Sequence, residues 1–132
     1  MSSYLLDSDW LINALAGRSR AIAPLERLSS KHIGVSVITL AEVYQQAFES
    51  TNPDAYLHSF RGFIAAFRII PVTEPIAVRF AEIRALLTRR GELISDFDIL
   101  IGATALHYDL TVLTFNLRHF SRIPDLTLYQ PS

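Results

Sequence analysis

Residues 95–114 read SDFDILIGATALHYDLTVLT, and this stretch decides the fold. Ser95 opens the most apolar helix of the chain, whose core we expect over residues 99–106. A short turn through Tyr108 and Asp109 then leads into an apolar strand at 111–114. A helix followed at once by a strand is one unit of an alternating α/β chain.

The same alternation extends back to the N-terminus. Further strands are predicted at residues 4–6, 32–36 and 69–72, with a last one at 126–129. Helices are predicted from Asp7 to Gly17 and over 20–28, 38–48, 52–67 and 75–90. Thr73 is expected to cap the last of these helices, and Gly91 to end it.

Strands separated by whole helices cannot pair as hairpins. The sheet should therefore be mainly parallel, with helices on both faces. The sequence thus predicts an α/β fold, a three-layer α/β/α sandwich. A chain of 132 residues with 50% hydrophobic content builds one core, so we expect a single domain over 1–132.

Composition excludes several classes of function. The formal net charge of −1 gives no polybasic surface for coating nucleic acid, and Lys31 is the only lysine. The absence of cysteine excludes disulfides, zinc-thiolate sites and thiol nucleophiles, so a metal would need oxygen ligands. The N-terminal residues lack the pattern of a signal peptide and every apolar run is too short to span a membrane, so we expect a cytoplasmic protein.

Three acidic residues stand where an α/β sheet binds ligands. Asp7 ends the first strand, Glu42 follows the second within the first helical turns, and Asp98 begins the apolar helix. Each has a simpler explanation: Asp7 could cap a helix, and Thr39 to Glu42 and Ser95 to Asp98 both match the capping box.

Considered together, the three acids indicate a cation site. Carboxylates gathered at one sheet edge repel one another unless a cation neutralises them. Mg²⁺ or Mn²⁺ prefers oxygen ligands and keeps open positions for a phosphate group, which suits hydrolysis of phosphate esters.

Four segments also carry a resemblance to a known family. They are LLDSD at 5–9, SVITLAEV at 36–43, FDILIGATA at 97–105 and LTVLTFN at 110–116, followed by Phe120. In this order they resemble the PIN-domain nucleases, and more narrowly the VapC-type toxins of bacterial toxin–antitoxin pairs. The resemblance covers nearly the whole chain and implies a PIN-like fold with metal-dependent endoribonuclease activity.

The resemblance also assigns the residues of the site. It implies that Asp7, Glu42 and Asp98 bind or position Mg²⁺ or Mn²⁺ and are catalytic. Its fourth catalytic position falls on Asn116, which would act through water or a hydrogen bond instead of adding charge. Asp96, close to Asp98 in the sequence, is the second choice for the third acid.

Other polar residues near the same edge could support this site. The hydroxyls of Ser8 and Thr114 could orient a carboxylate, although such residues at turns are often structural. Flanking phosphates of a substrate could be held by four arginines, which alternatively form ordinary solvated turns: Arg18, Arg20, Arg118 and Arg122. His119 lies near the same edge and could touch the substrate, or could be a surface residue.

Partners follow from the resemblance as well. It implies an RNA substrate cut to leave a 5′-phosphate and a 3′-hydroxyl, a homodimer, and a small VapB-like antitoxin whose helix and arginine-bearing tail cover the acids. With the antitoxin, a heterotetramer or a larger assembly is implied.

Two other classes of protein remain as alternatives. A phosphoryl-accepting receiver domain or a haloacid-dehalogenase-like phosphatase also places an aspartate after its first strand. Both need a lysine at a later strand end, however, and Lys31 precedes the second strand. A PIN-like binding module without catalysis is the other alternative, and the presence of all three acids argues against it.

Overall fold

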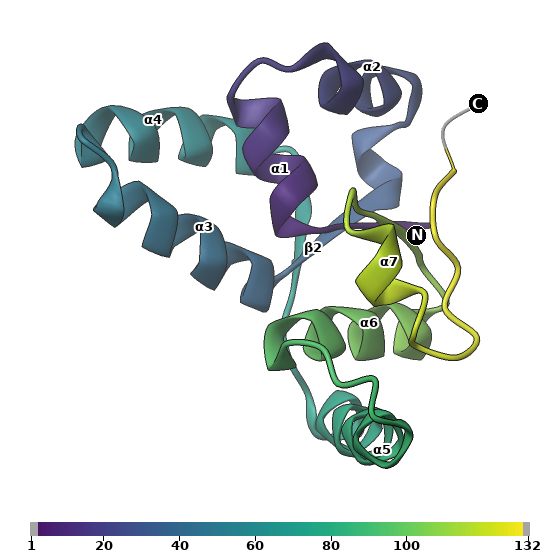
Figure 1. Ribbon diagram of the computed structural model, residues 1–132. Coiled ribbons are helices and arrows are strands. Elements are labelled where there is room, and N and C mark those ends of the chain that lie inside the picture. The colour runs from purple at the N-terminus through teal and green to yellow at the C-terminus, as the bar shows by residue number, and fades with distance from the viewer. Residues whose placement is uncertain (1–2, 131–132) are drawn as a thin grey trace.

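The computed structural model describes residues 3–130, and its centre is a four-stranded sheet with helices on both faces (Figure 1). The elements in chain order are β1 (Tyr4–Leu6), α1 (Ser8–Leu15), α2 (Ser19–Arg27), the 3-10 turn η1 (Ser30–His32), β2 (Ile33–Ser36), α3 (Val37–Glu49), α4 (Pro53–Ile64), β3 (Arg68–Ile70), α5 (Glu74–Arg90), α6 (Asp96–Tyr108), β4 (Thr111–Leu113) and α7 (Leu117–Phe120).

The sheet is parallel throughout and has the strand order β3-β2-β1-β4. The first strand is therefore central, with Leu5 beside Val112 of β4. One residue beyond the strand, the Asp7 N–H still donates to the carbonyl oxygen of Leu113, at 3.0 Å. This bond fixes Asp7 in the middle of the rim formed by the carboxyl ends of the strands, next to the residue that follows Leu113.

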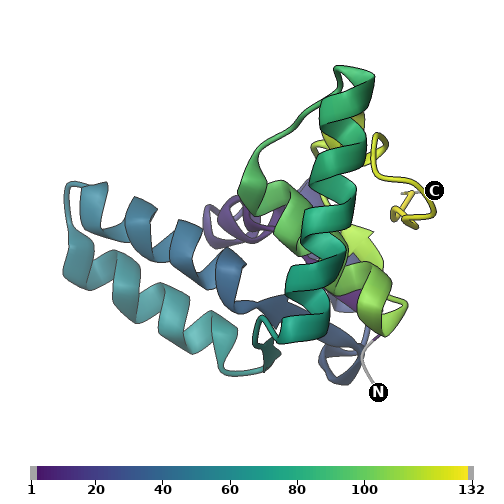
Figure 2. The same ribbon diagram turned by 90° about the horizontal axis from the view of Figure 1, so that it is seen from below.

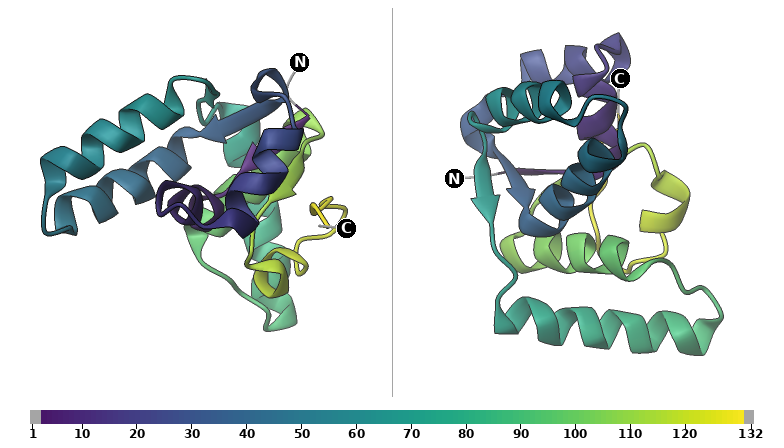
Figure 3. Two further views of the ribbon diagram at one scale, coloured as in Figure 1. Left: turned by 90° about the horizontal axis from the view of Figure 1, so that it is seen from above. Right: turned by 90° about the vertical axis from the view of Figure 1, so that its left-hand side faces the viewer.

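Two apolar cores enclose the sheet, because successive side chains of a strand point to opposite faces. Leu6 packs with Trp10 and Phe60 on the face covered by α1 to α4, whereas Leu5 packs with Ile83 and other residues of α5 and α6 on the opposite face. Figures 1 and 3 show the two helical layers with the strands between them. The predicted three-layer α/β/α sandwich with a parallel sheet is confirmed.

The helices α3 and α4 form an antiparallel pair that extends beyond the sheet (Figure 2). Asn52 caps α4 by accepting a hydrogen bond from the Ala55 N–H at 3.2 Å, and Pro53 stands in the first turn, where its missing N–H costs nothing. The rings of Tyr44 and Phe60 pack edge to face across the pair, with centroids 5.1 Å apart.

Two local predictions were wrong. Residues 126–129 form an isolated bridge to β4, between Leu128 and Val112, and not a strand: the Val112 N–H donates to the Thr127 carbonyl oxygen, and the Val112 carbonyl oxygen accepts from the Tyr129 N–H. Thr73 occupies the N-cap position of α5, but its hydroxyl makes no capping bond.

The remaining differences concern the ends of elements. The fourth helix ends at Ile64, earlier than predicted, and Val72 and Thr114 lie just outside their strands. Gly91 ends α5 in the left-handed region with φ 66°, as predicted. Within residues 3–130, no helix combines the length and the apolar character needed to cross a membrane.

Candidate active site

Asp7 is the most deeply buried acid of the rim. Only 3% of it is exposed, and its Oδ2 accepts a hydrogen bond from the Thr114 hydroxyl at 2.8 Å. Its Oδ1 is buried and has no hydrogen-bond partner among the described residues. Asp7 occupies the N-cap position of α1 without making a capping bond, so the simpler explanation of this residue was wrong. A buried carboxylate oxygen without a donor requires another explanation.

The surroundings of Asp7 oppose its negative charge. Burial raises the pKa of Asp7 well above its ordinary value, and the charges of Asp9 and Asp98 raise it further. Hydrogen bonds from the Thr114 hydroxyl and the Ser8 N–H act in the opposite direction. The burial and the neighbouring acids outweigh these donors, so an ionised Asp7 is destabilised unless a cation comes close.

Thr114 connects the first strand to the turn that follows the last one. Its hydroxyl donates to Asp7 and accepts a hydrogen bond from the Asn116 N–H at 3.0 Å. The Asp9 carboxylate, in the first turn of α1, accepts from the Phe115 N–H at 3.2 and 3.3 Å. These bonds hold the turn of residues 114–116 against the start of α1. Thr114 therefore lies where a supporting residue was predicted.

Asp9 is the residue that the sequence analysis missed. It was quoted within the motif LLDSD but was assigned no part in the site. In the structure it lies close enough to Asp7, Glu42 and Asp98 for its charge to raise the pKa of each. The available signal was its place in the first turn of a helix that starts at the rim.

Glu42 approaches the rim from the second turn of α3. Its Oε1 accepts a hydrogen bond from the Ser8 hydroxyl at 2.9 Å, which places Ser8 in the predicted supporting position. Burial raises the pKa of Glu42, the bond from Ser8 lowers it, and the charges of Asp98 and Asp9 raise it. The capping box predicted at Thr39 and Glu42 was wrong, because Ser36 caps α3 by accepting a bond from the Ile38 N–H.

Asp98 enters the rim from the first turn of α6. Ser95 caps this helix by accepting from the Asp98 N–H at 3.2 Å, whereas the Asp98 carboxylate faces Asn116, whose Nδ2 lies 3.5 Å from its Oδ2. Burial raises the pKa of Asp98, the Ser95 hydroxyl and then His119 lower it, and Asp9 raises it. His119 Nδ1 lies 2.9 Å from Asn116 Nδ2 and 3.9 Å from Asp98 Oδ2, so His119 is also part of the rim.

Asp96 does not lie with these acids. Its carboxylate binds the guanidinium of Arg84 on α5 at 2.8 Å, and 57% of its side chain is exposed. Residues two positions apart on a helix point about 200° apart around its axis, so Asp96 and Asp98 cannot face the same rim. The structure therefore places Asp98 at the rim and Asp96 away from it, beside Arg84.

The four arginines named in the sequence analysis have separate surroundings. Arg20 stands over the ring of Phe115, at 4.4 Å, and Phe115 stacks on Trp10 with centroids 4.2 Å apart. Two others make hydrogen bonds of their own: Arg18 donates to the Asn13 side chain at 2.6 Å, and Arg122 to the Glu92 carbonyl oxygen at 3.4 Å. Arg118 is exposed in α7. Of the four, Arg20 has the clearest structural connection to the rim.

The donor set suits a hard divalent cation. Asp7, Asp9, Glu42 and Asp98 supply oxygen ligands only, and one buried oxygen of Asp7 has no donor. Within residues 3–130, however, no group of three His, Cys, Asp or Glu side chains is close enough together to hold a metal ion in its present conformation. Binding of an ion at this rim would therefore require some of these side chains to rotate, or water to bridge them.

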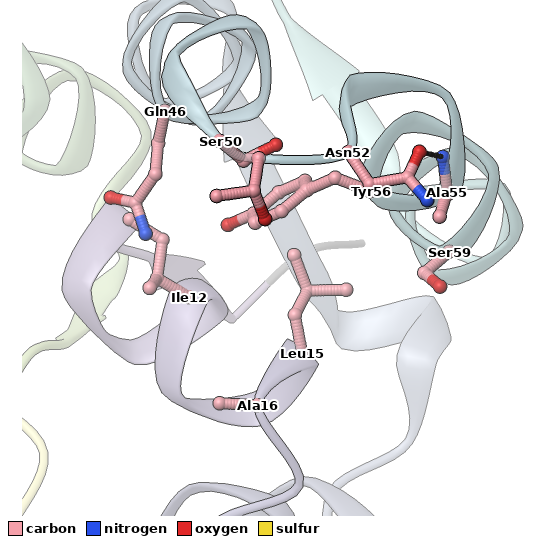
Figure 4. A pocket seen from close by; sticks show the side chains of 10 residues that line it. Ile12, Leu15, Ala16, Gln46, Ser50, Asn52, Ala55, Tyr56 and Ser59 are labelled. Carbon is pink, nitrogen blue, oxygen red and sulfur yellow. Dashed lines mark hydrogen bonds between the residues drawn. The ribbon is translucent and has the colours of Figure 1, made fainter.

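A groove lies between α1 and the pair formed by α3 and α4 (Figure 4). Its volume is about 390 Å³, and it separates the C-terminal half of α1 from the turn between α3 and α4. Ile12 and Leu15 face it from α1, and Gln46 and Tyr56 from the other two helices.

The comparisons with known proteins agree with this fold. The model of the PIN domain family matches residues 4–126. The tRNA(fMet)-specific endonuclease VapC of Salmonella typhimurium is 30% identical over 128 residues, 97% of each chain, and the ribonuclease VapC2 of Haemophilus influenzae is 31% identical over 123 residues, 93% of each chain. Among solved structures, DNA-bound VapBC from Salmonella typhimurium superimposes with a TM-score of 0.92 at 29% identity and VapBC2 from Rickettsia felis with 0.90 at 26%, each covering 98% of both chains.

Proposed function

The chain belongs to the PIN-domain family, and from this premise we propose that it is a metal-dependent endoribonuclease, the toxin of a toxin–antitoxin pair. The observation that carries the proposal is the buried Asp7 carboxylate, with one oxygen lacking a donor and other acids beside it. Buried carboxylates that lie close together are destabilised when they are ionised, and a divalent cation bound beside them stabilises the ionised forms.

We propose Mg²⁺ or Mn²⁺ as that cation, held by Asp7, Glu42 and Asp98. When bound, the ion supplies Lewis acidity toward water and toward the phosphodiester. The protein contributes the orientation of its ligands: Thr114 holds Oδ2 of Asp7, and Ser8 holds Oε1 of Glu42. Such hydrogen bonds to metal ligands are worth about 10- to 100-fold in metal affinity or activity.

Asn116 takes the fourth catalytic position in this proposal. Its amide lies between the Asp98 carboxylate and the His119 ring and adds no negative charge to the rim. It therefore orients Asp98 through a hydrogen bond, while His119 provides the nearest ionisable base to the same carboxylate. Arg20 and Arg118 are the residues we expect to meet phosphates on either side of the cleaved bond.

A small antitoxin is the proposed protein partner, as in the VapBC complexes that this fold resembles. The groove of Figure 4 offers Ile12 and Leu15 to the apolar face of a helix and polar side chains at its edges. We expect the complex to be cytoplasmic and built on a homodimer of the toxin.

The first experiment is cleavage of labelled RNA with Mg²⁺, Mn²⁺ or EDTA. Initiator tRNA is the first substrate to test, because a relative is named for tRNA(fMet). We expect metal-dependent products with a 5′-phosphate, and loss of cleavage in Asp7→Asn and Asp98→Asn. Binding of RNA without cleavage would favour a binding module, and labelling of Asp7 by acetyl phosphate would favour a receiver domain.

Expression in a bacterial host tests the second half of the proposal. We expect growth arrest by the wild-type protein, relief by coexpression of the neighbouring antitoxin gene, and normal growth with Asp98→Asn. Normal growth with abundant wild-type protein would contradict the toxin role but leave the nuclease activity in place.

A further inference from the structure

A second hollow, with a volume of about 270 Å³, lies beside α3 and next to the acids of the rim. It shares two residues with the rim, Ser8 and Glu42, which hydrogen-bond to each other at 2.9 Å. Its other walls are Ile12, Gln45, Gln46, Glu49 and Phe97. A group bound in this hollow would lie directly beside the residues proposed to cleave RNA.

One face of α3 forms the polar wall. Glu42, Gln45, Gln46 and Glu49 are spaced three, four and seven residues from the first, so they share one side of the helix. The Gln45 amide lies 3.5 Å from the Glu49 carboxylate and can donate to it. The wall therefore presents two carboxylates, which accept hydrogen bonds, and two amides, which both donate and accept.

Phe97 adds an aromatic surface to the lining of this hollow. It immediately precedes Asp98 in the first turn of α6, and it is 41% exposed although large hydrophobic side chains are normally covered. An exposed aromatic ring at the edge of a polar hollow is suited to stacking against a flat ring of a ligand.

The composition of the walls decides which part of an RNA fits. Among the residues that the structure describes, no lysine, arginine or histidine lines the hollow, and its two carboxylates would repel a phosphate group. A nucleobase is uncharged and flat and carries hydrogen-bonding groups along its edge. Proteins that recognise single-stranded RNA bind such bases by stacking on an aromatic side chain and by hydrogen bonds to the base edge.

We propose that this hollow binds the base of one nucleotide next to the cleaved phosphate, and that Glu49 selects bases with an exocyclic amino group. The proposal rests on the ribonuclease function proposed above. Adenine, cytosine and guanine carry an exocyclic amino group that can donate to the Glu49 carboxylate. Uracil has a carbonyl oxygen where cytosine has its amino group, and the carboxylate repels this oxygen. Phe97 stacks on whichever base enters.

The test uses an RNA that the protein cuts at one position, prepared with A, C, G, U or an abasic nucleotide on each side of the cut. For one of the two positions, we expect kcat/KM with amino-bearing bases to exceed that with the abasic RNA by about tenfold, the scale of base stacking on an aromatic ring. Phe97→Leu should bring this ratio close to one and Phe97→Tyr should preserve it. Glu49→Gln should remove the preference for cytidine over uridine.

Phe48→Leu is the matched control, because Phe48 is a neighbouring aromatic of α3 that is 65% exposed and does not line the hollow. Its ratios should equal those of the wild type. If the kcat/KM ratios stay unchanged in both Phe97→Leu and Glu49→Gln, the inference is wrong. This also holds if the two variants lose affinity for the antitoxin while their ratios stay unchanged. Absence of cleavage by the wild-type protein would instead contradict the proposed function itself.

Discussion

Replacing Asp7 by asparagine should stabilise the metal-free protein while abolishing cleavage. Asp7 is 3% exposed, and the negative charges of Asp9 and Asp98 oppose its ionised form. The effective cost of burying an ion is several kcal/mol, and each hydrogen bond to a charged group returns about 1.5–3 kcal/mol. Asparagine keeps the shape and removes the charge. We therefore expect a gain of about 1–3 kcal/mol in the free energy of unfolding at neutral pH.

The sign of the pH dependence follows from the raised pKa of Asp7. An acid whose pKa is higher in the folded than in the unfolded state binds its proton more tightly when folded, so it contributes stability at low pH. This contribution is lost as the pH rises from the ordinary value of 3.8 through the higher folded value. The advantage of Asp7→Asn should therefore be absent in acid, grow above pH 3.8 and level off once Asp7 is ionised in both states.

The assay is urea unfolding of both proteins in EDTA across this pH range, with thermal unfolding as a second measure. A gain of 1 kcal/mol raises Tm by about 3–5 °C for a chain of this size. Asp54→Asn, an exposed acid in the first turn of α4, is the control and should show no gain. If Asp7→Asn is no more stable than the wild type at neutral pH, the charge on Asp7 is not destabilising and the reasoning fails.

Three further substitutions test the groups around the acids. Thr114→Val removes the donor to Asp7, so it should lower the free energy of unfolding by about 1–3 kcal/mol and also lower kcat. Thr114→Ser should recover both values. An unchanged kcat in Thr114→Val would show that Thr114 does not position Asp7 for cleavage. Ser8→Ala removes the donor to Glu42 and should weaken Mn²⁺ binding about 10-fold or more, measured by calorimetry; equal affinity would contradict this. Asp96→Asn should leave cleavage intact and change the free energy of unfolding by less than about 1 kcal/mol, because its ion pair is exposed; loss of cleavage would return Asp96 to the site.

The two aspartates of α6 illustrate how far the sequence alone could go. Both Asp96 and Asp98 lie in the first turn of a helix that was predicted from its apolar residues. Which one faces the rim depends on how the helix is rotated about its axis against the sheet. That rotation is set by packing of Ile99 and Ile101 in the core below the sheet, which local propensities do not determine.

Capping residues illustrate a second limit. Thr39 and Glu42 match a capping box, yet α3 begins earlier and is capped by Ser36, which frees Glu42 for Ser8 on another helix. A residue that satisfies a local pattern can therefore be used by a distant partner when the fold brings one within reach. Asp9 was missed because the N–H group that binds its carboxylate follows the last strand, more than a hundred residues away in the sequence.

The sequence by itself determined the alternation of strands and helices, the parallel sheet and the positions of Asp7, Glu42 and Asp98 along the chain, because these depend on local periodicity and on the burial of short apolar strands. Only the tertiary structure decided that β1 lies between β2 and β4. That strand order brings Thr114 to Asp7, because neighbouring parallel strands end at the same edge of the sheet. Contacts between residues so distant in the chain depend on the packing of the whole core, and no local segment encodes them.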